Sequence, residues 1–185
     1  MEIITLTPHQ MITLNDYPIY NVEMLRLYFS RCQSGQALPL VPVIHKAIVR
    51  QYFTSELCAK LEAFERANPP VTHFMVDGSH RTTALTLTGR KIDVIVYATD
   101  DDIAETRRLV DTGRVLENAT LLHSLAENCA ILRRHFQEKP GFMTVQQKTE
   151  KLIRDNYIAH FGLPDQGIHN TFKQEDSNVR SLDTK

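Results

Sequence analysis

The sequence predicts an α/β (α+β) protein, with a compact mixed-sheet domain flanked by helices and followed by a C-terminal helical pair. Over residues 1–113, short runs of β-branched and aromatic residues alternate with segments of helical periodicity. Over residues 114–162 only helical periodicity remains, and residues 163–185 are polar enough to predict a flexible tail. Apolar residues make up 42% of the chain and charged residues 23%, which is typical of a soluble globular protein.

The first strands and helices are predicted from the spacing of apolar residues and from the glycine and proline residues that interrupt it. Residues 3–6 and 11–14 predict two short strands. Residues 21–34 predict a helix, because apolar side chains recur at helical spacing until Gly35 ends it. Residues 38–49 are apolar and β-branched but contain two prolines, so they predict a strand at a sheet edge or a bulge.

The middle of the chain continues this alternation. Residues 54–67 predict a helix that stops at an Asn-Pro-Pro breaker, and residues 92–97 are strongly β-prone. Three consecutive aspartates then begin a predicted helix over residues 101–111. Consecutive helical residues point in different directions, so we interpret the aspartates as an acidic first turn rather than a metal site.

The C-terminal region predicts two helices. An apolar stripe over residues 115–136 predicts a long first helix. The second begins at Thr144, which forms a capping-box pattern with Gln147, and runs to about residue 161. We expect the two helices to form an antiparallel pair packed on the α/β part.

The junction that follows residues 71–76 carries the strongest functional signal. Residues 71–76 follow a Pro-Pro breaker and predict a buried strand. The next five residues, 77–81, read Asp-Gly-Ser-His-Arg, and the glycine permits a sharp turn or a close approach to a ligand. Ser79 is the predicted N-cap of a short helix that Gly89 ends.

The first turn of this predicted helix favours an anion. His80 and Arg81 place cationic side chains at the end where the helix dipole already disfavours them, and the helix N–H groups are free there. A phosphate would compensate both. The alternative is that these side chains are solvated or pair with carboxylates such as Asp77.

In this setting the junction resembles the ParB/sulfiredoxin superfamily, and the resemblance spans about residues 11–110. Residues 76–84, Val-Asp-Gly-Ser-His-Arg-Thr-Thr-Ala, are similar to the family's Gly-x-x-Arg turn, which leads from a strand into a helix and binds nucleotide phosphates. A helix ending at Gly35, followed by Leu-Pro-Leu-Val-Pro-Val at residues 38–43, is similar to the family's lead-in. The resemblance implies a ParB/sulfiredoxin-like nucleotide-binding domain over residues 1–113.

Branches of this family differ in chemistry. Sulfiredoxins carry a catalytic cysteine where this chain has Ser79, and a hydroxyl is not ionised at neutral pH, which argues against sulfinic-acid repair. Partition ParB proteins bind CTP and centromere DNA with a more basic turn. Free-serine kinases have Asp-Gly-His-His-Arg, matched here at four of five positions, and use an upstream glutamate where this chain offers Asp16. Plasmid fertility-inhibition proteins of the family combine ATP hydrolysis with nuclease activity.

The resemblance implies two sets of site residues for an ATP-using phosphotransferase or nucleotide hydrolase. The residues expected to bind the nucleotide are Gly78, Ser79, His80, Arg81 and Thr82. The residues expected to be catalytic are Asp77, His80, Arg81 and Asp16. The expected cofactors are ATP or another nucleotide with Mg²⁺, and Asp77 is the expected metal ligand. His80 and Arg81 would neutralise developing charge, and Arg81→Ala is expected to abolish nucleotide binding while leaving the fold intact.

Two alternatives stay open. One is a ParB-like DNA-binding protein or nuclease for plasmid partition or fertility inhibition, with DNA contacted through Arg133, Arg134 and neighbouring basic residues. The basic clusters of the sequence are Arg107, Arg108 and Arg114, and then Arg133, Arg134, Lys139, Lys148 and Lys151. The other alternative is a non-catalytic interaction module. A net charge of −1 argues against a surface that binds nucleic acid everywhere.

The remaining sequence features concern the thiols, a possible zinc site and the cellular location. Cys32, Cys58 and Cys129 are widely spaced on apolar helical faces, so we expect buried free thiols. The histidines lack the paired spacing of a zinc site. With no apolar run of membrane-spanning length and no signal-peptide pattern, we expect a cytoplasmic protein without a membrane partner.

Overall fold

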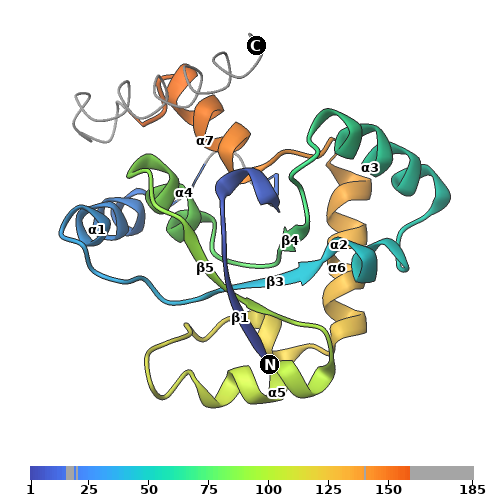
Figure 1. Ribbon diagram of the computed structural model, residues 1–185, viewed down its shortest axis with the longest axis horizontal. Coiled ribbons are helices and arrows are strands. Elements are labelled where there is room, and N and C mark those ends of the chain that lie inside the picture. Colours follow the sequence, from blue (N-terminus) through green and yellow to red (C-terminus); the bar gives the residue numbers. More distant parts are fainter. Residues whose placement is uncertain (16–18, 20, 140, 159–185) are drawn as a thin grey trace, which may run out of the picture.

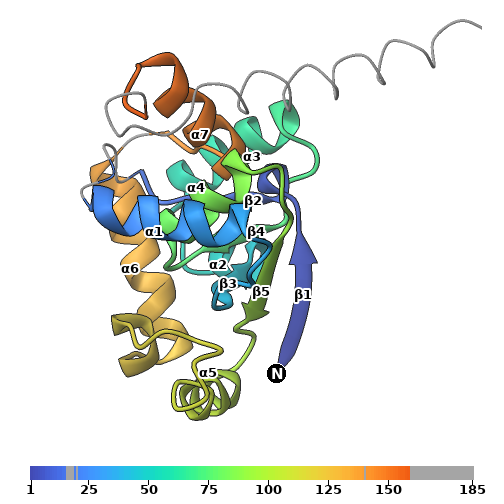
Figure 2. The same cartoon turned by 90° about the vertical axis from the view of Figure 1, so that its left-hand side faces the viewer.

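The computed structural model describes residues 1–15, 19, 21–139 and 141–158. Asp16, the predicted tail over residues 163–185 and the predicted end of the last helix at residue 161 lie outside the described residues. The described part is built on one five-stranded sheet, with helices packed against it (Figures 1 and 2).

The sheet combines parallel and antiparallel pairs. Its strands are β1 (Glu2–Leu6), β2 (Met11–Ile12), β3 (Val41–His45), β4 (His73–Met75) and β5 (Ile92–Val96). They lie in the order β1-β5-β3-β4-β2. The β1–β5 and β3–β4 pairs are antiparallel, whereas β3–β5 and β2–β4 are parallel. The predicted mixed α/β class is therefore confirmed.

The strand predicted over residues 38–49 differs from its prediction in two ways. Its second half forms the short helix α2 (Lys46–Arg50), and β3 lies at the centre of the sheet rather than at an edge. The β3–β4 ladder begins at the Val43–Met75 pair, so Pro42 lies just beyond its end, where its carbonyl accepts from Val76 N at 3.1 Å. The missing N–H of Pro42 therefore falls at the end of this ladder and not within it.

The helices agree with the predicted periodicity in most places. The longer helices are α1 (Val22–Gln33), α3 (Ser55–Ala67), α4 (Ser79–Leu87), α5 (Asp100–Arg108), α6 (Leu125–Glu138) and α7 (Val145–Arg154). Two 3-10 turns, η1 (Pro8–Gln10) and η2 (Ala119–Leu122), complete the set. The predicted capping box of Thr144 and Gln147 is confirmed at the start of α7.

The long helix predicted over residues 115–136 is shorter than expected. It begins only at Leu125, because Ser124 caps it: the Ser124 hydroxyl accepts from Glu127 N at 3.2 Å, and the Glu127 carboxylate accepts from Ser124 N at 2.7 Å. The η2 turn and an irregular segment precede it. Apolar spacing continues through these turns, so periodicity alone concealed the helix start.

Each face of the sheet has its own core. Along a strand, successive side chains alternate between faces, so Val43 and Val94 join one core while Ile44 and Ile95 join the other. Side chains of α1, α4 and α7 complete the first core, and side chains of α2, α3, α5 and α6 complete the second. The α4 helix is central to the first core, since every residue from Arg81 to Leu87 is buried.

The C-terminal helices do not form the predicted antiparallel pair. In Figure 1, α7 lies at the top of the molecule beside α4, while α6 runs along the right-hand side. Leu132 and Phe136 of α6 belong to the second core, whereas Val145 and Leu152 of α7 belong to the first. The two helices therefore cover opposite faces of the sheet.

Two further expectations concern thiols and membranes. Cys32 and Cys129 are buried free thiols as predicted, and Cys58 is a free thiol that is only half-buried. Burial raises the pKa of the Cys129 thiol to about 11, so it stays protonated at neutral pH. Among the described residues, no helix has both the length and the apolar character needed to cross a bilayer.

Candidate functional site

The turn between β4 and α4 depends on Gly78. Gly78 has φ 108° and ψ 25°, in the left-handed region, and it is the N-cap of α4 in place of the predicted Ser79. A Cβ at this position would lie 3.1 Å from Nη2 of Arg81 and 3.2 Å from both methyl groups of Val41. Both the conformation and the close packing therefore require glycine.

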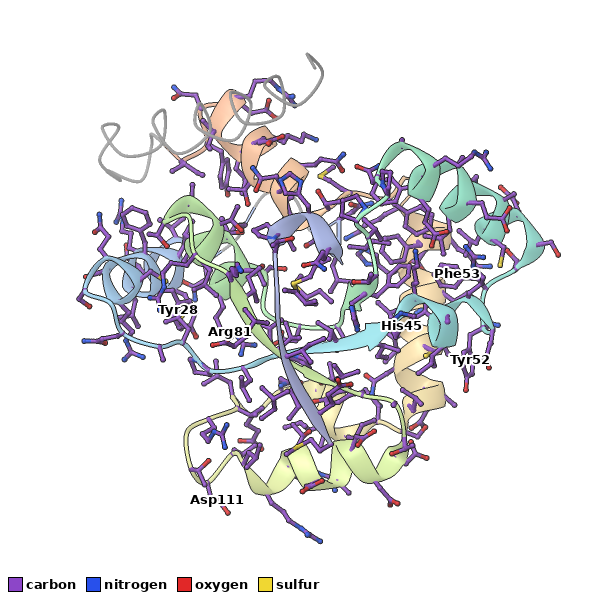
Figure 3. The ribbon with its side chains drawn as sticks, in the orientation of Figure 1. Tyr28, His45, Tyr52, Phe53, Arg81 and Asp111 are labelled. Atoms are coloured by element: carbon purple, nitrogen blue, oxygen red, sulfur yellow. The ribbon has the colours of Figure 1, made fainter. Side chains whose placement is uncertain are left out.

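Arg81 is a buried structural residue rather than a free cation. Its side chain is 2% exposed, its Nη2 donates to Oδ2 of Asp77 at 2.6 Å, and its Nη1 donates to the carbonyl of Leu40 at 2.6 Å and that of Pro39 at 3.2 Å. Figure 3 shows it deep inside the molecule near the start of β3. The guanidinium thus ties the turn to the segment before β3, so the predicted neutralisation of a phosphate by Arg81 needs correction.

The N-terminus of α4 is open. The first hydrogen bond of the helix runs from Thr82 N to the Gly78 carbonyl at 2.9 Å, and no side chain of the described residues caps the helix. The N–H groups of Ser79, His80 and Arg81 therefore need partners from outside the helix. This is the arrangement that the sequence predicts for an anion site.

His80 is a neutral imidazole at neutral pH. Burial lowers its pKa below 6.5, Lys148 and Arg81 lower it further, and Asp77 opposes them. Its Nε2 is shielded from solvent and has no hydrogen-bond partner among the described residues. His80 therefore offers an uncharged nitrogen for proton transfer or hydrogen bonding at pH 7, whereas the sequence predicted that it would supply positive charge.

A cavity of about 520 Å³ opens at this helix end. The whole predicted pentapeptide, residues 77–81, forms its polar wall. The apolar wall consists of Leu14, Ile19, Met24, Tyr28 and Leu116. Tyr28 of α1 is seen beside this region in Figure 3. Glu117 and Asn118 complete the lining, so the cavity joins a helix N-terminus to a slot for an apolar or aromatic group.

One described residue of the predicted site, Thr82, is not brought into this lining. The Thr82 hydroxyl is buried and lies 3.1 Å from the Gly78 carbonyl and 3.2 Å from the Ser79 carbonyl, so it bonds back to its own helix. Asp16 lies outside the described residues. The nearest described neighbours in sequence, Leu14 and Ile19, do line the cavity.

Among the described residues that line the cavity, carboxylates outnumber unpaired cationic side chains. Asp77 is 41% exposed and Glu117 is exposed, while the charge of Arg81 is already paired with Asp77. Oδ2 of Asp77 accepts from Arg81, and its Oδ1 accepts no hydrogen bond from the described residues. No group of three histidine, cysteine or acidic side chains within the described residues could hold a metal.

Two further residues bear on this site without having been predicted for it: Glu117 lines the cavity, and Lys148 lowers the pKa of His80. Glu117 comes from the irregular segment after α5, and nothing local in the sequence marks it. Lys148 is only 2% exposed, and its Nζ donates to the Leu14 carbonyl at 3.1 Å. Its spacing from Val145 and Leu152 places it on the buried stripe of α7, which is a signal that the sequence did contain.

The basic clusters predicted from the sequence do not assemble as expected. Arg133 and Arg134 are exposed on α6, whereas Lys148 is buried on α7 at the opposite face of the sheet. In the first cluster, Arg107 donates to the carbonyl of Leu121. Lys148 therefore does not share a surface with Arg133 and Arg134.

Comparisons with known proteins add no relative. No protein-family model matches the chain, and neither the curated proteins nor the solved structures contain a match. The resemblance to the ParB/sulfiredoxin superfamily therefore stays a prediction, and the argument for function rests on the cavity.

Proposed function

We propose that the protein binds a nucleotide by its phosphates at the N-terminus of α4 and transfers or hydrolyses the terminal phosphoryl group, with ATP and Mg²⁺ as substrate and metal. The observation that carries this proposal is the pairing of an open helix N-terminus with an apolar wall in one cavity. The resemblance of residues 76–84 to a ParB/sulfiredoxin nucleotide turn supports it.

The dimensions of the cavity suit a nucleotide. Its volume of about 520 Å³ falls within the range of roughly 300–1,000 Å³ that is usual for small-molecule sites. Phosphate oxygens would accept from the free N–H groups of residues 79–81, and a base would lie against Met24 and Tyr28. One end of the ligand is therefore polar and charged, and the other is flat and apolar.

The carboxylates of the cavity fit a nucleotide that arrives with its metal. Mg²⁺ prefers oxygen ligands and is held by one or two carboxylates together with substrate phosphates. Asp77 Oδ1 and the Glu117 carboxylate are the available protein oxygens. In this role the metal would neutralise the phosphates, a charge that Arg81 cannot supply because it is bound to Asp77 and two carbonyls.

His80 is assigned the proton transfer. An attacking hydroxyl or water forms a bond to the terminal phosphorus while the bond from that phosphorus to the bridging oxygen breaks. The proton of the attacking group passes to the neutral imidazole of His80, whose lowered pKa keeps it unprotonated at pH 7. Arg81 acts as a positioning residue, because it fixes the Asp77 carboxylate at the edge of the turn.

A thermal-shift screen tests the binding claim. ATP, ADP, CTP and GTP would each be added with and without Mg²⁺, since a ligand that binds only the folded state must raise the Tm. We expect a rise of several degrees with a Mg²⁺-nucleotide and a smaller rise without the metal. His123→Gln serves as a control in a half-buried histidine outside the cavity. If no nucleotide raises the Tm at millimolar concentration, the proposal fails.

A further inference from the structure

A second cavity, of about 360 Å³, is lined in part by residues 37–40, the segment that precedes β3. Arg31, from the last turn of α1, and Arg114, from the segment after α5, both line it. Residues 37–40 and Gly113 form the rest of its wall together with Asp93 of β5. The cavity therefore draws on three parts of the chain that are far apart in sequence.

The two arginines of this cavity are not neutralised by any carboxylate of the described residues. Neither Arg31 nor Arg114 forms an ion pair within 4.0 Å of a carboxylate among the described residues. The one carboxylate of the lining, Asp93, accepts instead from the Thr5 hydroxyl at 2.7 Å. Two guanidinium groups and one carboxylate leave the lining with net positive charge.

The backbone that carries these arginines is held in place. The carbonyl of Arg114 accepts from Leu40 N at 2.9 Å, and the carbonyl of Arg31 accepts from Gln36 N at 3.0 Å. Arg90 donates to the Gln36 carbonyl at 2.8 Å, which fixes the other side of the same wall. The side chains of Arg31 and Arg114 are themselves exposed, so the anchored backbone places two guanidinium groups where a ligand can reach them.

We propose that this arginine cavity, formed by Arg31, Arg114, Asp93 and residues 37–40, is a second anion site that binds the phosphate group of a small phosphate monoester. Arginine presents planar paired donors that match phosphate oxygens. The volume exceeds that of a phosphate group alone, and Ala37 and Leu38 supply apolar surface for a short organic portion. The site is separate from the cavity at the N-terminus of α4, which we call the nucleotide cavity after its proposed ligand. It does not depend on the proposed phosphoryl transfer.

Side-chain NMR of arginine tests this assignment directly. Glycerol 3-phosphate would be titrated into the full chain labelled with ¹⁵N-arginine, with glycerol as the uncharged counterpart. We expect the Nε–Hε signals of Arg31 and Arg114 to shift with glycerol 3-phosphate and to stay in place with glycerol. The signals of Arg133 and Arg134, which are exposed on α6 outside both cavities, should not move.

Variants then separate the arginine cavity from the nucleotide cavity. In calorimetry, Arg31→Gln/Arg114→Gln should weaken glycerol 3-phosphate binding at least tenfold, while Arg133→Gln/Arg134→Gln should leave it unchanged. Asp93→Asn should tighten binding several-fold, because it removes the competing carboxylate. Equal affinity in wild type and Arg31→Gln/Arg114→Gln would overturn the proposal.

A short oligonucleotide distinguishes the source of the phosphate. If Arg31 and Arg114 respond to a ten-nucleotide single strand and not to glycerol 3-phosphate, the small-molecule assignment is wrong and the site belongs to nucleic acid. A chain that fails to bind any nucleotide in the thermal-shift screen can still show the glycerol 3-phosphate response. The two proposals therefore fail independently.

Discussion

The two cavities on either side of the Pro39–Leu40 segment hold arginine in opposite ways. In the nucleotide cavity, Arg81 is 2% exposed and donates hydrogen bonds to Asp77 and to two backbone carbonyls. In the arginine cavity, Arg31 and Arg114 have no such partners among the described residues. The arginine inside the recognisable motif is therefore structural, and the arginines outside any motif are the ones with donors left for a ligand.

The two cavities also differ in the groups that would donate hydrogen bonds to a ligand. The nucleotide cavity offers backbone N–H groups at the start of α4, with carboxylates beside them. The arginine cavity offers side-chain guanidinium groups with one carboxylate beside them. We infer that the first suits an anion accompanied by a metal ion, and that the second suits a bare anion.

The largest expected effect that separates the cavities is on stability. Arg81→Ala should lower the free energy of unfolding by about 3–5 kcal/mol, because it leaves the Asp77 carboxylate and two carbonyls without their partner. Urea denaturation would measure it. Arg114→Ala, the matched change in the arginine cavity, should cost less than about 0.5 kcal/mol. A loss in Arg81→Ala as small as that expected for Arg114→Ala would contradict the structural role of Arg81 and restore the expectation that its removal leaves the fold intact.

The next effect concerns the pH dependence of turnover in the nucleotide cavity. Because the pKa of His80 lies below 6.5, the imidazole is unprotonated at pH 7, and the rate should be flat above that pH and fall as the pH drops through this pKa. His80→Gln should lower kcat by about 100-fold, or about 2.7 kcal/mol, and remove the acidic limb. A pH–rate profile of both proteins would measure this. An acidic limb that persists in His80→Gln would assign the proton transfer to another group.

A smaller effect is expected from the glycine that shapes the turn. Gly78→Ala should lower the free energy of unfolding by about 1–3 kcal/mol, because alanine is strained at φ 108° and its Cβ meets Arg81 and Val41. The matched change in the arginine cavity is Gly113→Ala, which has φ 70° but no atom within 4 Å of the added Cβ. Thermal unfolding of the two variants isolates the contribution of the close contacts. A Gly113→Ala protein that loses as much stability as Gly78→Ala would show that backbone strain alone decides.

The smallest effect tests whether the cavities communicate. Leu40 links them, since its carbonyl accepts from Arg81 while its N–H donates to the Arg114 carbonyl. Saturating glycerol 3-phosphate should tighten nucleotide binding about five-fold, or about 1 kcal/mol, because it would order the exposed Arg31 and Arg114 side chains against the segment that holds Arg81. Calorimetry in both orders of addition would measure it, because linkage requires the same factor either way. Unchanged affinities in both orders of addition would mean that the cavities act separately.

Much of the fold could be predicted from the sequence because its signals are local. The strand over residues 71–76, the turn and the helix after it depend on neighbouring side chains and on one glycine. The helix start at Thr144 was identified for the same reason. Where the predictions failed, as for the central position of β3 and for the separation of α6 from α7, the outcome depends on pairing between distant segments.

The sequence by itself determined that residues 77–81 form a strand-to-helix turn with an open helix end, since backbone geometry at glycine and helix capping are short-range properties. Only the tertiary structure decided which side chains of that turn are free. Arg81 meets carbonyls of residues 39 and 40, and Glu117 reaches the same cavity from beyond α5. Segments that are tens of residues apart in sequence bury some polar groups and hydrogen-bond to them, and they leave other polar groups available to a ligand. No local sequence pattern predicts which groups stay available.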